Sequence, residues 1–356
     1  MRDFEYEVLH ARIVFGAGAT RTRLAAEVER LGSGRLLVIC SERDTALADA
    51  LTAPFASRVA GRFIGIRQHV PLDVATRARA HAVEIAADGM LCIGGGSATG
   101  TAKAVALTTG LPVLAVPTTY AGSEVTPIWG LTEGGRKTTG TDPVVLPRIV
   151  VYDPELTLGL PVELSVTSGF NALAHCVDAL WAPRRSPIGM LVAEEGIRAL
   201  GAGLPVVAAD PADLGARSDL LYGAYLAGTA LTAAGSGLHH TICHVLGGAF
   251  DLPHAATHAV VLPHVLAFNA PRAPEAVRRI GRALGTDDPV AELRALAARL
   301  GVPRGLRKLG LRAEQADEAA RLVADAAPAG NPAPVDLAAM RTLLRAAWSG
   351  GPATTG

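Results

Sequence analysis

The pattern of apolar residues along the chain changes abruptly near Pro161. Before this residue, short apolar runs alternate with helical segments. After it, strand signals stop and windows of helical periodicity continue to the end. A βαβα order predicts a parallel sheet covered by helices, and 356 residues exceed what one hydrophobic core usually organises. We therefore expect an α/β domain in residues 1–160 and an all-helical domain in residues 161–356.

The expected elements follow this division. Strands are expected at 35–40, 61–66 and 149–153, and at the start of the segments 89–100 and 111–123. Between them, Glu133-Gly134-Gly135 predicts a hairpin within 127–148. Helices are expected at 72–87 and 101–110 and, in the second domain, at 165–182, 190–203, 213–234, 237–249, 254–268, 273–284, 288–300, 312–326 and 336–348.

Composition excludes several classes of partner. The formal net charge is zero, whereas a nucleic-acid site needs a clustered basic face. The N-terminus is charged and does not resemble a signal peptide. The longest uncharged run, 220–238, approaches the length of a membrane span, but its Gly, Thr, Ser and Tyr residues favour a buried helix. The four cysteines form no CxxC pair, which is typical of reduced thiols in a cytoplasmic protein.

A glycine-rich turn follows the apolar run that begins at Gly89. Gly94, Gly95 and Gly96 let the backbone turn sharply and approach a ligand, and the helix after them offers N–H groups to a pyrophosphate. Small-residue turns at 14–18 and 117–124 support a ligand site, because open α/β sheets bind ligands where their strands end. The alternative is a tight βα turn without a ligand, and the GxGxxG fingerprint is not met.

Histidines are concentrated in one short stretch. The segment 237–258 holds five of the ten: His239, His240, His244, His254 and His258. His240 and His244 are four residues apart and share a helical face.

The helix expected at 165–182 carries a second such pair. Asn171 and His175 are also four residues apart. Together with His240 and His254 they form a credible set of ligands for a divalent metal. The alternative is a group of ordinary core histidines. His258 and His264 are expected to be structural, and His239 is expected to face away from the site.

Several long motifs resemble the iron-containing alcohol dehydrogenase superfamily, and within it the maleylacetate reductase branch. They are GGGSATGTAKA, PTTYAGSEVTPIWGLTEGGRK, DPELTLGLP, NALAHCVDALW, AEEGIRAL and LHHTICHVLGGAFDLPHAATHAVVLPH. The resemblance implies a dinucleotide-binding α/β domain, an all-helical domain and an active site between them. It also implies reduction of 2-maleylacetate to 3-oxoadipate with NADH or NADPH in aromatic-compound breakdown.

The resemblance also bears on the metal. Metal-bearing members use one Asp and three His, at positions that correspond to Asn171, His175, His240 and His254. The acidic ligand is therefore replaced by a neutral amide, as in the maleylacetate reductase branch. Loss of that charge weakens binding of a divalent ion. We expect no tightly bound metal and read the cluster as an imidazole-lined polar pocket.

Roles follow from these motifs. Candidate catalytic residues are His244 and His254 as proton donors, with His175 and His240 orienting them or binding a carboxylate. Candidate substrate contacts are Asn171, Lys103 and Arg136. The expected cofactor contacts are Gly94, Gly95, Gly96, Ser97, Thr118, Thr119, Ser123 and Ser41. Ser41 stands where NAD-specific relatives place an Asp, so we expect both cofactors to be accepted.

Departures from the branch leave other functions open. Thr241 replaces a typical Lys, and the segment 327–333 lacks the aromatic residues and the Arg usual there. A dicarboxylate needs cationic partners. The alternatives are a related dehydrogenase acting on another hydroxy or oxo acid, or a nucleotide-binding protein without catalytic activity. We further expect a homodimer, a small-molecule oxo-acid substrate, and no nucleic-acid or membrane partner.

Overall fold

The computed structural model describes residues 4, 6, 10–134 and 136–352, and at residues 136 and 137 it describes the backbone only. The chain divides after Leu160 into two compact units, an α/β unit before it and a helical unit that begins at Pro161.

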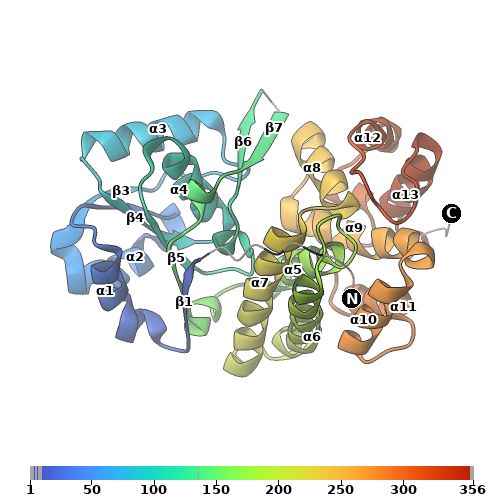
Figure 1. The fold of residues 1–356 in the computed structure, drawn as a ribbon, viewed down its shortest axis with the longest axis horizontal. Coiled ribbons are helices and arrows are strands. Elements are labelled where there is room, and N and C mark those ends of the chain that lie inside the picture. The colour runs from blue at the N-terminus through green and yellow to red at the C-terminus, as the bar shows by residue number, and fades with distance from the viewer. Residues whose placement is uncertain (1–3, 5, 7–9, 135, 353–356) are drawn as a thin grey trace. The chain divides into compact units, whose positions relative to one another are not determined.

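The α/β unit is built on a six-stranded parallel sheet (Figure 1). The strand order is β1-β8-β5-β4-β2-β3, so β4 and β5 lie at its centre and β1 and β3 at its edges. The central strands are buried throughout, as expected of apolar runs covered on both faces. The strands are β1 (Arg12–Phe15), β2 (Leu36–Ile39), β3 (Val59–Phe63), β4 (Gly89–Gly94), β5 (Val113–Pro117) and β8 (Ile149–Tyr152).

Four α-helices and a hairpin complete this unit. The helices are α1 (Ala19–Leu31), α2 (Thr45–Thr52), α3 (Leu72–Glu84) and α4 (Gly96–Thr109). Strands β6 (Ile128–Glu133) and β7 (Arg136–Thr141) pair antiparallel with Glu133 opposite Arg136, which confirms the hairpin.

Two features of the α/β unit differ from expectation. Helix α1 was not among the expected elements; its basic and acidic residues on the exposed face dilute the apolar signal. Helix α4 begins at Gly96 rather than at residue 101, so Gly96 and Ser97 belong to its first turn.

The helical unit contains nine α-helices among its described residues, each close to an expected window (Figure 1). They are α5 (Val162–Ala179), α6 (Pro187–Ala209), α7 (Leu214–Ala234), α8 (Leu238–Phe250), α9 (His254–Asn269), α10 (Pro274–Leu284), α11 (Pro289–Arg299), α12 (Ala313–Asp325) and α13 (Leu337–Ser349). One expected end was wrong: α6 continues through Pro205 to Ala209 instead of ending at 203.

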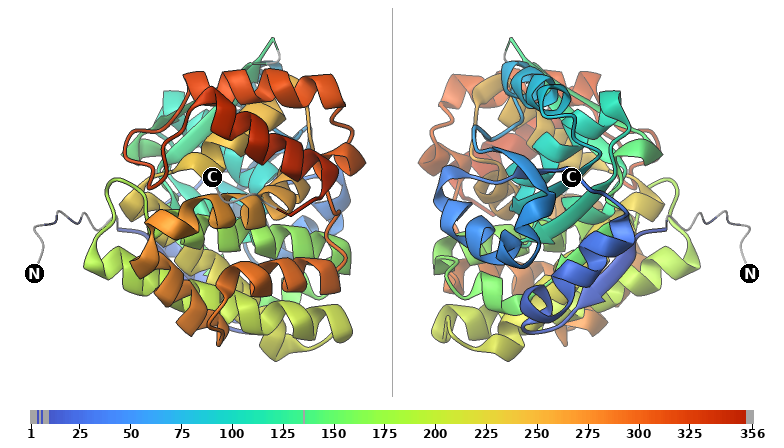
Figure 2. Two further views of the ribbon diagram at one scale, coloured as in Figure 1. Left: turned by 90° about the vertical axis from the view of Figure 1, so that its right-hand side faces the viewer. Right: turned by 90° about the vertical axis from the view of Figure 1, so that its left-hand side faces the viewer.

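Helix α5 is the centre of the helical unit. It packs against α6, α7 and α9, and every residue from Ser165 to Ala179 is buried. Helix α8 packs against α9, and α12 lies beside α13 (Figure 2). A polar side chain on α5 is therefore enclosed by protein, so it needs a partner within the unit.

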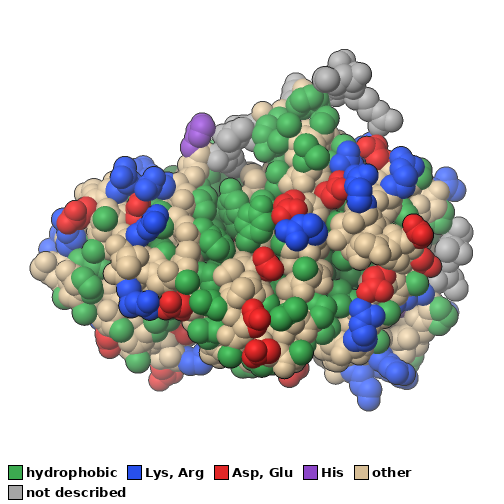
Figure 3. Space-filling model, turned by 90° about the horizontal axis from the view of Figure 1, so that it is seen from below, with side chains coloured by type: hydrophobic (Ala, Val, Ile, Leu, Met, Phe, Trp, Pro, Cys, Tyr) green, Lys and Arg blue, Asp and Glu red, His purple; other side chains and the backbone are tan. Residues whose placement is uncertain are grey.

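The surface charges, the cysteines and the helices can each be compared with the expectations from composition. On the face shown in Figure 3, acidic and basic side chains are interspersed. All four cysteines are free and buried. In the described part of the chain, no helix is both long and apolar enough to cross a membrane.

Candidate functional site

The glycine turn joins β4 to α4 at the centre of the sheet. Gly94 has φ of 143°, a conformation that side chains rarely adopt. Its carbonyl accepts a hydrogen bond of 3.1 Å from the Thr118 N–H at the end of β5. The turn and the segment after β5 therefore lie side by side at the carboxyl edge of the sheet, where parallel α/β folds bind ligands.

A side chain at Gly95 has no room. A Cβ added there would lie 2.9 Å from both Oγ1 and Cγ2 of Thr119. The first N–H groups of α4, which begins at Gly96, have no acceptor within the helix. Bare backbone beside a helix N-terminus suits a pyrophosphate group. Gly94, Gly95, Gly96, Ser97, Thr118 and Thr119 are therefore brought together as the sequence predicts.

Ser41 follows β2 at the same edge of the sheet. Its hydroxyl donates to Asp44 Oδ2 at 2.5 Å and accepts from the Asp44 N–H at 3.2 Å. It lines a cavity of about 840 Å³ together with Arg43, Arg67 and Arg77. Sequence reasoning missed these three arginines, because two of them come from a segment that is distant in the chain.

Lys103 has a different environment from the one expected. Its side chain is 1 % exposed, and its ammonium group donates to four oxygens at 2.6–2.9 Å: those of Ser123, Thr126 (carbonyl and hydroxyl) and Ile128. These bonds occupy its donors and hold the segment between β5 and β6. We therefore withdraw Lys103 as a substrate contact.

Of the two other predicted residues, one belongs to this segment and one to the hairpin. Ser123 begins the short 3₁₀ helix Ser123–Val125, and its carbonyl accepts one of the Lys103 hydrogen bonds. Arg136 begins β7, and its side chain lies outside the described part of the structure.

The histidine cluster is formed by three helices of the helical unit. Helix α5 contributes His175, α8 contributes His240, and their rings stack with centroids 4.9 Å apart. The His244 ring lies 6.2 Å from that of His240, and the His254 ring lies 4.5 Å from that of His258. Packing of α5 and α8 against α9 thus gathers imidazoles that are up to 83 positions apart in the sequence.

The cluster includes two residues that the sequence had set aside. His258 was expected to be structural, yet its ring lies 5.3 Å from His240 and 6.2 Å from His175. His239 was expected to face away, yet its ring lies 5.4 Å from His240 and 4.8 Å from His258. Packing of α8 against α9 brings His239 within hydrogen-bond distance of His258, so His239 faces α9. His264 is buried separately on α9.

Asp178 is the main functional residue that sequence reasoning missed. It is fully buried, and its Oδ2 accepts a 2.7 Å hydrogen bond from His240 Nδ1. Trp181 Nε1 and the Gly237 N–H donate to the same carboxylate. Burial opposes ionisation, but these hydrogen bonds and the neighbouring histidines hold the pKa of Asp178 well below its usual range. Its position one turn after His175 on α5 was the available signal.

The carboxylate determines how His240 is oriented. With Nδ1 bound to Asp178, Nε2 is the nitrogen available to a ligand, and among the described residues it has no hydrogen-bond partner. His175 Nδ1 and Asn171 Oδ1 are also buried and have no hydrogen-bond partner among the described residues. Three polar atoms at the predicted positions are thus buried and ready to accept a ligand.

Burial favours the neutral form of three of these rings. It lowers the pKa of His175 and His258 well below the usual value, and nearby histidines add to the effect. It lowers the pKa of His239 to about 3. His244 and His254 are only half-buried. The two candidate proton donors are therefore the members of the cluster that have access to solvent.

Comparisons with known proteins agree with this architecture. Residues 10–154 match the model of the iron-containing alcohol dehydrogenases, and residues 165–348 match the C-terminal model of the Fe-containing alcohol dehydrogenase family. The maleylacetate reductase of Burkholderia cepacia is 49% identical over 98% of this chain and 99% of its own.

Solved structures give the same result. An iron-containing alcohol dehydrogenase from Corynebacterium glutamicum superposes with a TM-score of 0.94 at 49% identity, covering 98% of this chain and 97% of the other. The maleylacetate reductase of Agrobacterium tumefaciens gives a TM-score of 0.93 at 46% identity over 99% of both chains.

A glycine turn on a parallel sheet, followed by a helical unit with buried imidazoles, defines an NAD(P)-dependent oxidoreductase. The chain belongs to the iron-containing alcohol dehydrogenase family, and its sequence groups with the maleylacetate reductases.

Proposed function

We propose that this enzyme reduces 2-maleylacetate to 3-oxoadipate with NADH or NADPH. Near-full-length similarity to several maleylacetate reductases supports this substrate. The structural observation that carries the proposal is the buried pair His175 and His240 beside the amide of Asn171. It supplies neutral polar groups rather than a charged set of metal ligands.

The reaction adds a hydride and a proton across a carbon–carbon double bond. Bound nicotinamide supplies the hydride, which goes to the alkene carbon that is β to the ketone. The electron pair of the alkene moves toward the ketone and gives an enolate. An imidazolium then protonates the carbon α to the ketone, and the reduced cofactor would have supplied the hydride as the second hydrogen. An imidazole suits this step because its pKa lies near neutral pH.

We assign the roles in the cluster from burial. His244 and His254 are half-buried and can exchange protons with solvent, so they are the proposed proton donors. His175 and His240 are buried, and lowered basicity keeps His175 neutral. A neutral His175 imidazole donates one hydrogen bond to a carboxylate or enolate oxygen, whereas His240 already donates its Nδ1–H to Asp178 and offers Nε2 as an acceptor. The Asn171 amide is proposed as a further substrate contact.

Cofactor binding is assigned to the α/β unit. The backbone of Gly94–Gly96 and Ser97 would hold the pyrophosphate, with Thr118, Thr119 and Ser123 on the nicotinamide side. Ser41 itself carries a hydroxyl instead of the carboxylate that repels a 2′-phosphate, although this hydroxyl donates to the carboxylate of Asp44. Arg43, Arg67 and Arg77 line the adjoining cavity together with Glu42 and Asp73. Arg67 and Arg77 pair with Asp73, and the remaining N–H groups of the three guanidinium groups are proposed to bind that phosphate. We therefore propose that both cofactors are used.

We also propose that turnover requires no metal. The residues at the family's ligand positions are one amide and three imidazoles, all neutral ligands. Asp178 contributes one negative charge, but only behind His240. A divalent ion bound there would retain most of its charge in a buried place, which is costly. Iron held by an acidic ligand would polarise an oxygen of the substrate, and no step of the proposed reaction uses it.

One experiment tests these assignments together. The purified enzyme is treated exhaustively with a chelator, and steady-state kinetics are measured with maleylacetate and with either cofactor. Full turnover after chelation is expected. Loss of activity that stoichiometric iron or zinc restores would refute the metal-independent mechanism, and no oxidation of either cofactor would refute the substrate.

A second candidate function is reduction of another oxo acid. It is favoured by Thr241, whose hydroxyl donates to the Gly237 carbonyl, and by buried Ala333, where relatives carry cationic residues. Asn331, in the same segment as Ala333, is held by two hydrogen bonds of 3.0 and 2.8 Å between its side-chain amide and that of Asn269. A panel of mono- and dicarboxylic oxo acids distinguishes the two: higher kcat/KM for a monocarboxylic substrate would favour this candidate.

We propose a homodimer as the assembly. Strand β1 lies at an edge of the sheet and Phe15 on it is 38% exposed, so an unpaired edge is available to a second copy. Light scattering at micromolar concentration is expected to give twice the mass of the chain. A monomer mass would contradict the assembly.

A further inference from the structure

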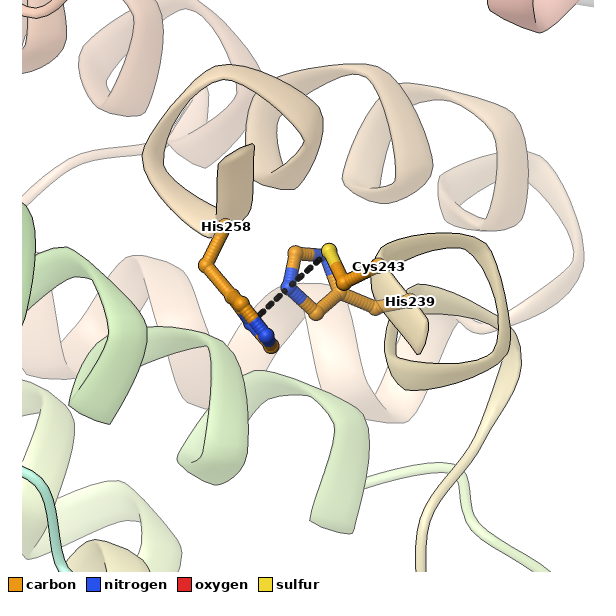
Figure 4. Close-up of side chains that lie close together, drawn as sticks. All are labelled: His239, Cys243 and His258. Atoms are coloured by element: carbon orange, nitrogen blue, oxygen red, sulfur yellow. Dashed lines mark hydrogen bonds between the residues drawn. The ribbon is translucent and has the colours of Figure 1, made fainter. Parts of the chain in front are cut away.

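Three side chains outside the family's ligand positions converge in the helical unit (Figure 4). They are His239 and Cys243 of α8, four residues apart on one helical face, and His258 of α9. His239 Nε2 lies 2.8 Å from His258 Nδ1 and 3.6 Å from Cys243 Sγ. The three ligand atoms lie within 4.8 Å of one another, and all three residues are at most 1% exposed.

These distances are close to those around a bound ion. With bonds of about 2.0 Å to nitrogen and about 2.3 Å to sulfur, two nitrogens on one ion lie about 3.3–3.5 Å apart. A nitrogen and a sulfur then lie about 3.5–3.7 Å apart. The sulfur of Cys243 already satisfies the second spacing. An ion would require the two imidazole nitrogens to separate by somewhat less than about 1 Å. It would also require Cys243 Sγ and His258 Nδ1, which lie within 4.8 Å of each other, to adopt the nitrogen–sulfur spacing.

The charge of the site selects the kind of ion. An imidazole binds a metal ion through the lone pair of its neutral form, so neither His239 nor His258 adds charge to the complex. A thiolate therefore supplies the only negative charge among the three ligands. A monovalent ion would give a neutral complex, whereas a divalent ion would leave one positive charge buried, which is costly.

We propose that His239, Cys243 and His258 form a three-coordinate site for one copper(I) ion. Thiolate and imidazole are ligands that this soft ion prefers. Binding forms a copper–sulfur bond and releases the thiol proton to solvent, with no change in oxidation state. The site shares no residue with the positions that correspond to the family's iron ligands, and the proposal does not depend on the substrate of the enzyme.

The test is an anaerobic titration of the chelator-treated full-length enzyme with copper(I), in competition with the coloured chelator bicinchoninate. We expect one copper(I) per chain and a thiolate-to-copper absorption band in the ultraviolet. Cys243→Ser should weaken binding at least about 100-fold and abolish the band. His258→Asn should also weaken binding, and it serves if the first variant fails to fold.

Matched controls come from the same helical unit. Cys176→Ser removes a buried free thiol on α5, whose sulfur faces Gly196 of α6. His264→Asn removes a buried imidazole on α9. Both should bind copper(I) like the parent enzyme. Failure of the parent to take copper(I) from the chelator, unchanged binding by Cys243→Ser, or tighter binding of zinc(II) at the same residues would each overturn the proposal.

Discussion

The α/β unit and the helical unit present polar groups to a ligand in opposite ways. At the glycine turn of the α/β unit, the groups belong to the backbone, and space for the ligand depends on missing side chains. In the helical unit, the backbone is satisfied within helices and imidazole side chains supply the chemistry. The first kind of site is sensitive to any added atom, and the second is sensitive to which side chain is present.

Each unit also contains a buried carboxylate that accepts hydrogen bonds from separate segments of the chain. Asp153 accepts from the N–H groups of Gly18, Thr20 and Glu155 in the α/β unit. Asp178 accepts from Trp181, Gly237 and His240 in the helical unit. Only the second carboxylate binds a candidate site residue. Variants that affect one unit but not the other therefore separate structural roles from chemical ones.

The largest expected effect is at the glycine turn. Gly95→Val should reduce cofactor binding below detection, because its methyl groups would occupy the space of the pyrophosphate. Cofactor fluorescence titration measures this. Thr119 must also shift, since the new Cβ lies 2.9 Å from it, so thermal unfolding is recorded in parallel.

Gly159→Val is the matched control for this prediction. A Cβ at Gly159 meets nothing within 4 Å, so both binding and unfolding should be unchanged. If Gly95→Val folds and binds cofactor with parental affinity, the glycine turn is only a tight connection between β4 and α4.

The next effect concerns the proton donor in the helical unit. His244→Ala should lower kcat by about 10²–10⁴-fold, because a positioned acid contributes that much. Affinity for the cofactor should change little, since the glycine turn belongs to the other unit. The basic limb of the rate–pH profile should disappear. His254→Ala is the comparison: near-normal turnover in His244→Ala with an inactive His254→Ala would transfer the role to His254.

A smaller effect is expected when either buried carboxylate is replaced, and it distinguishes the role of Asp178 from that of Asp153. Asp178→Asn and Asp153→Asn should each lower the free energy of unfolding by about 3 kcal/mol. Each carboxylate accepts N–H donors on both oxygens, so an amide NH₂ must face another N–H. Urea unfolding gives both values. Only Asp178→Asn should also lower kcat, because it alone orients His240; equal kcat losses in both variants would contradict this.

The smallest effect per residue is the loss of folding stability at low pH. Burial lowers the pKa of His175, His239, His258 and His264, the last to about 4. Below about pH 6.5 the unfolded chain therefore binds protons that the folded chain does not, so stability is present above that pH and is lost as the pH falls. Each histidine contributes at most about 1.4 kcal/mol per pH unit.

This response should be confined to the helical unit. The described histidines of the α/β unit, His10, His69 and His81, are at least partly exposed. Urea unfolding from pH 7 to pH 5 is followed by tryptophan fluorescence in a Trp129→Phe background, where Trp181 and Trp348 report on the helical unit. His264→Asn should reduce the pH dependence. Stability of the helical unit that does not change with pH would contradict the neutral, buried state of these rings.

The sequence by itself determined the two-unit architecture, because the period of the apolar residues differs between strands and helices. It also located the glycine turn and the helices that carry the histidines, since glycines and four-residue spacings are local signals.

Only the tertiary structure decided which nitrogen faces which neighbour. Asp178 beside His240, His258 within the cluster and Lys103 bound to Ser123, Thr126 and Ile128 all depend on packing between distant segments. Spacing along one helix shows which residues share a face, but the neighbour of that face is set by how the helices pack.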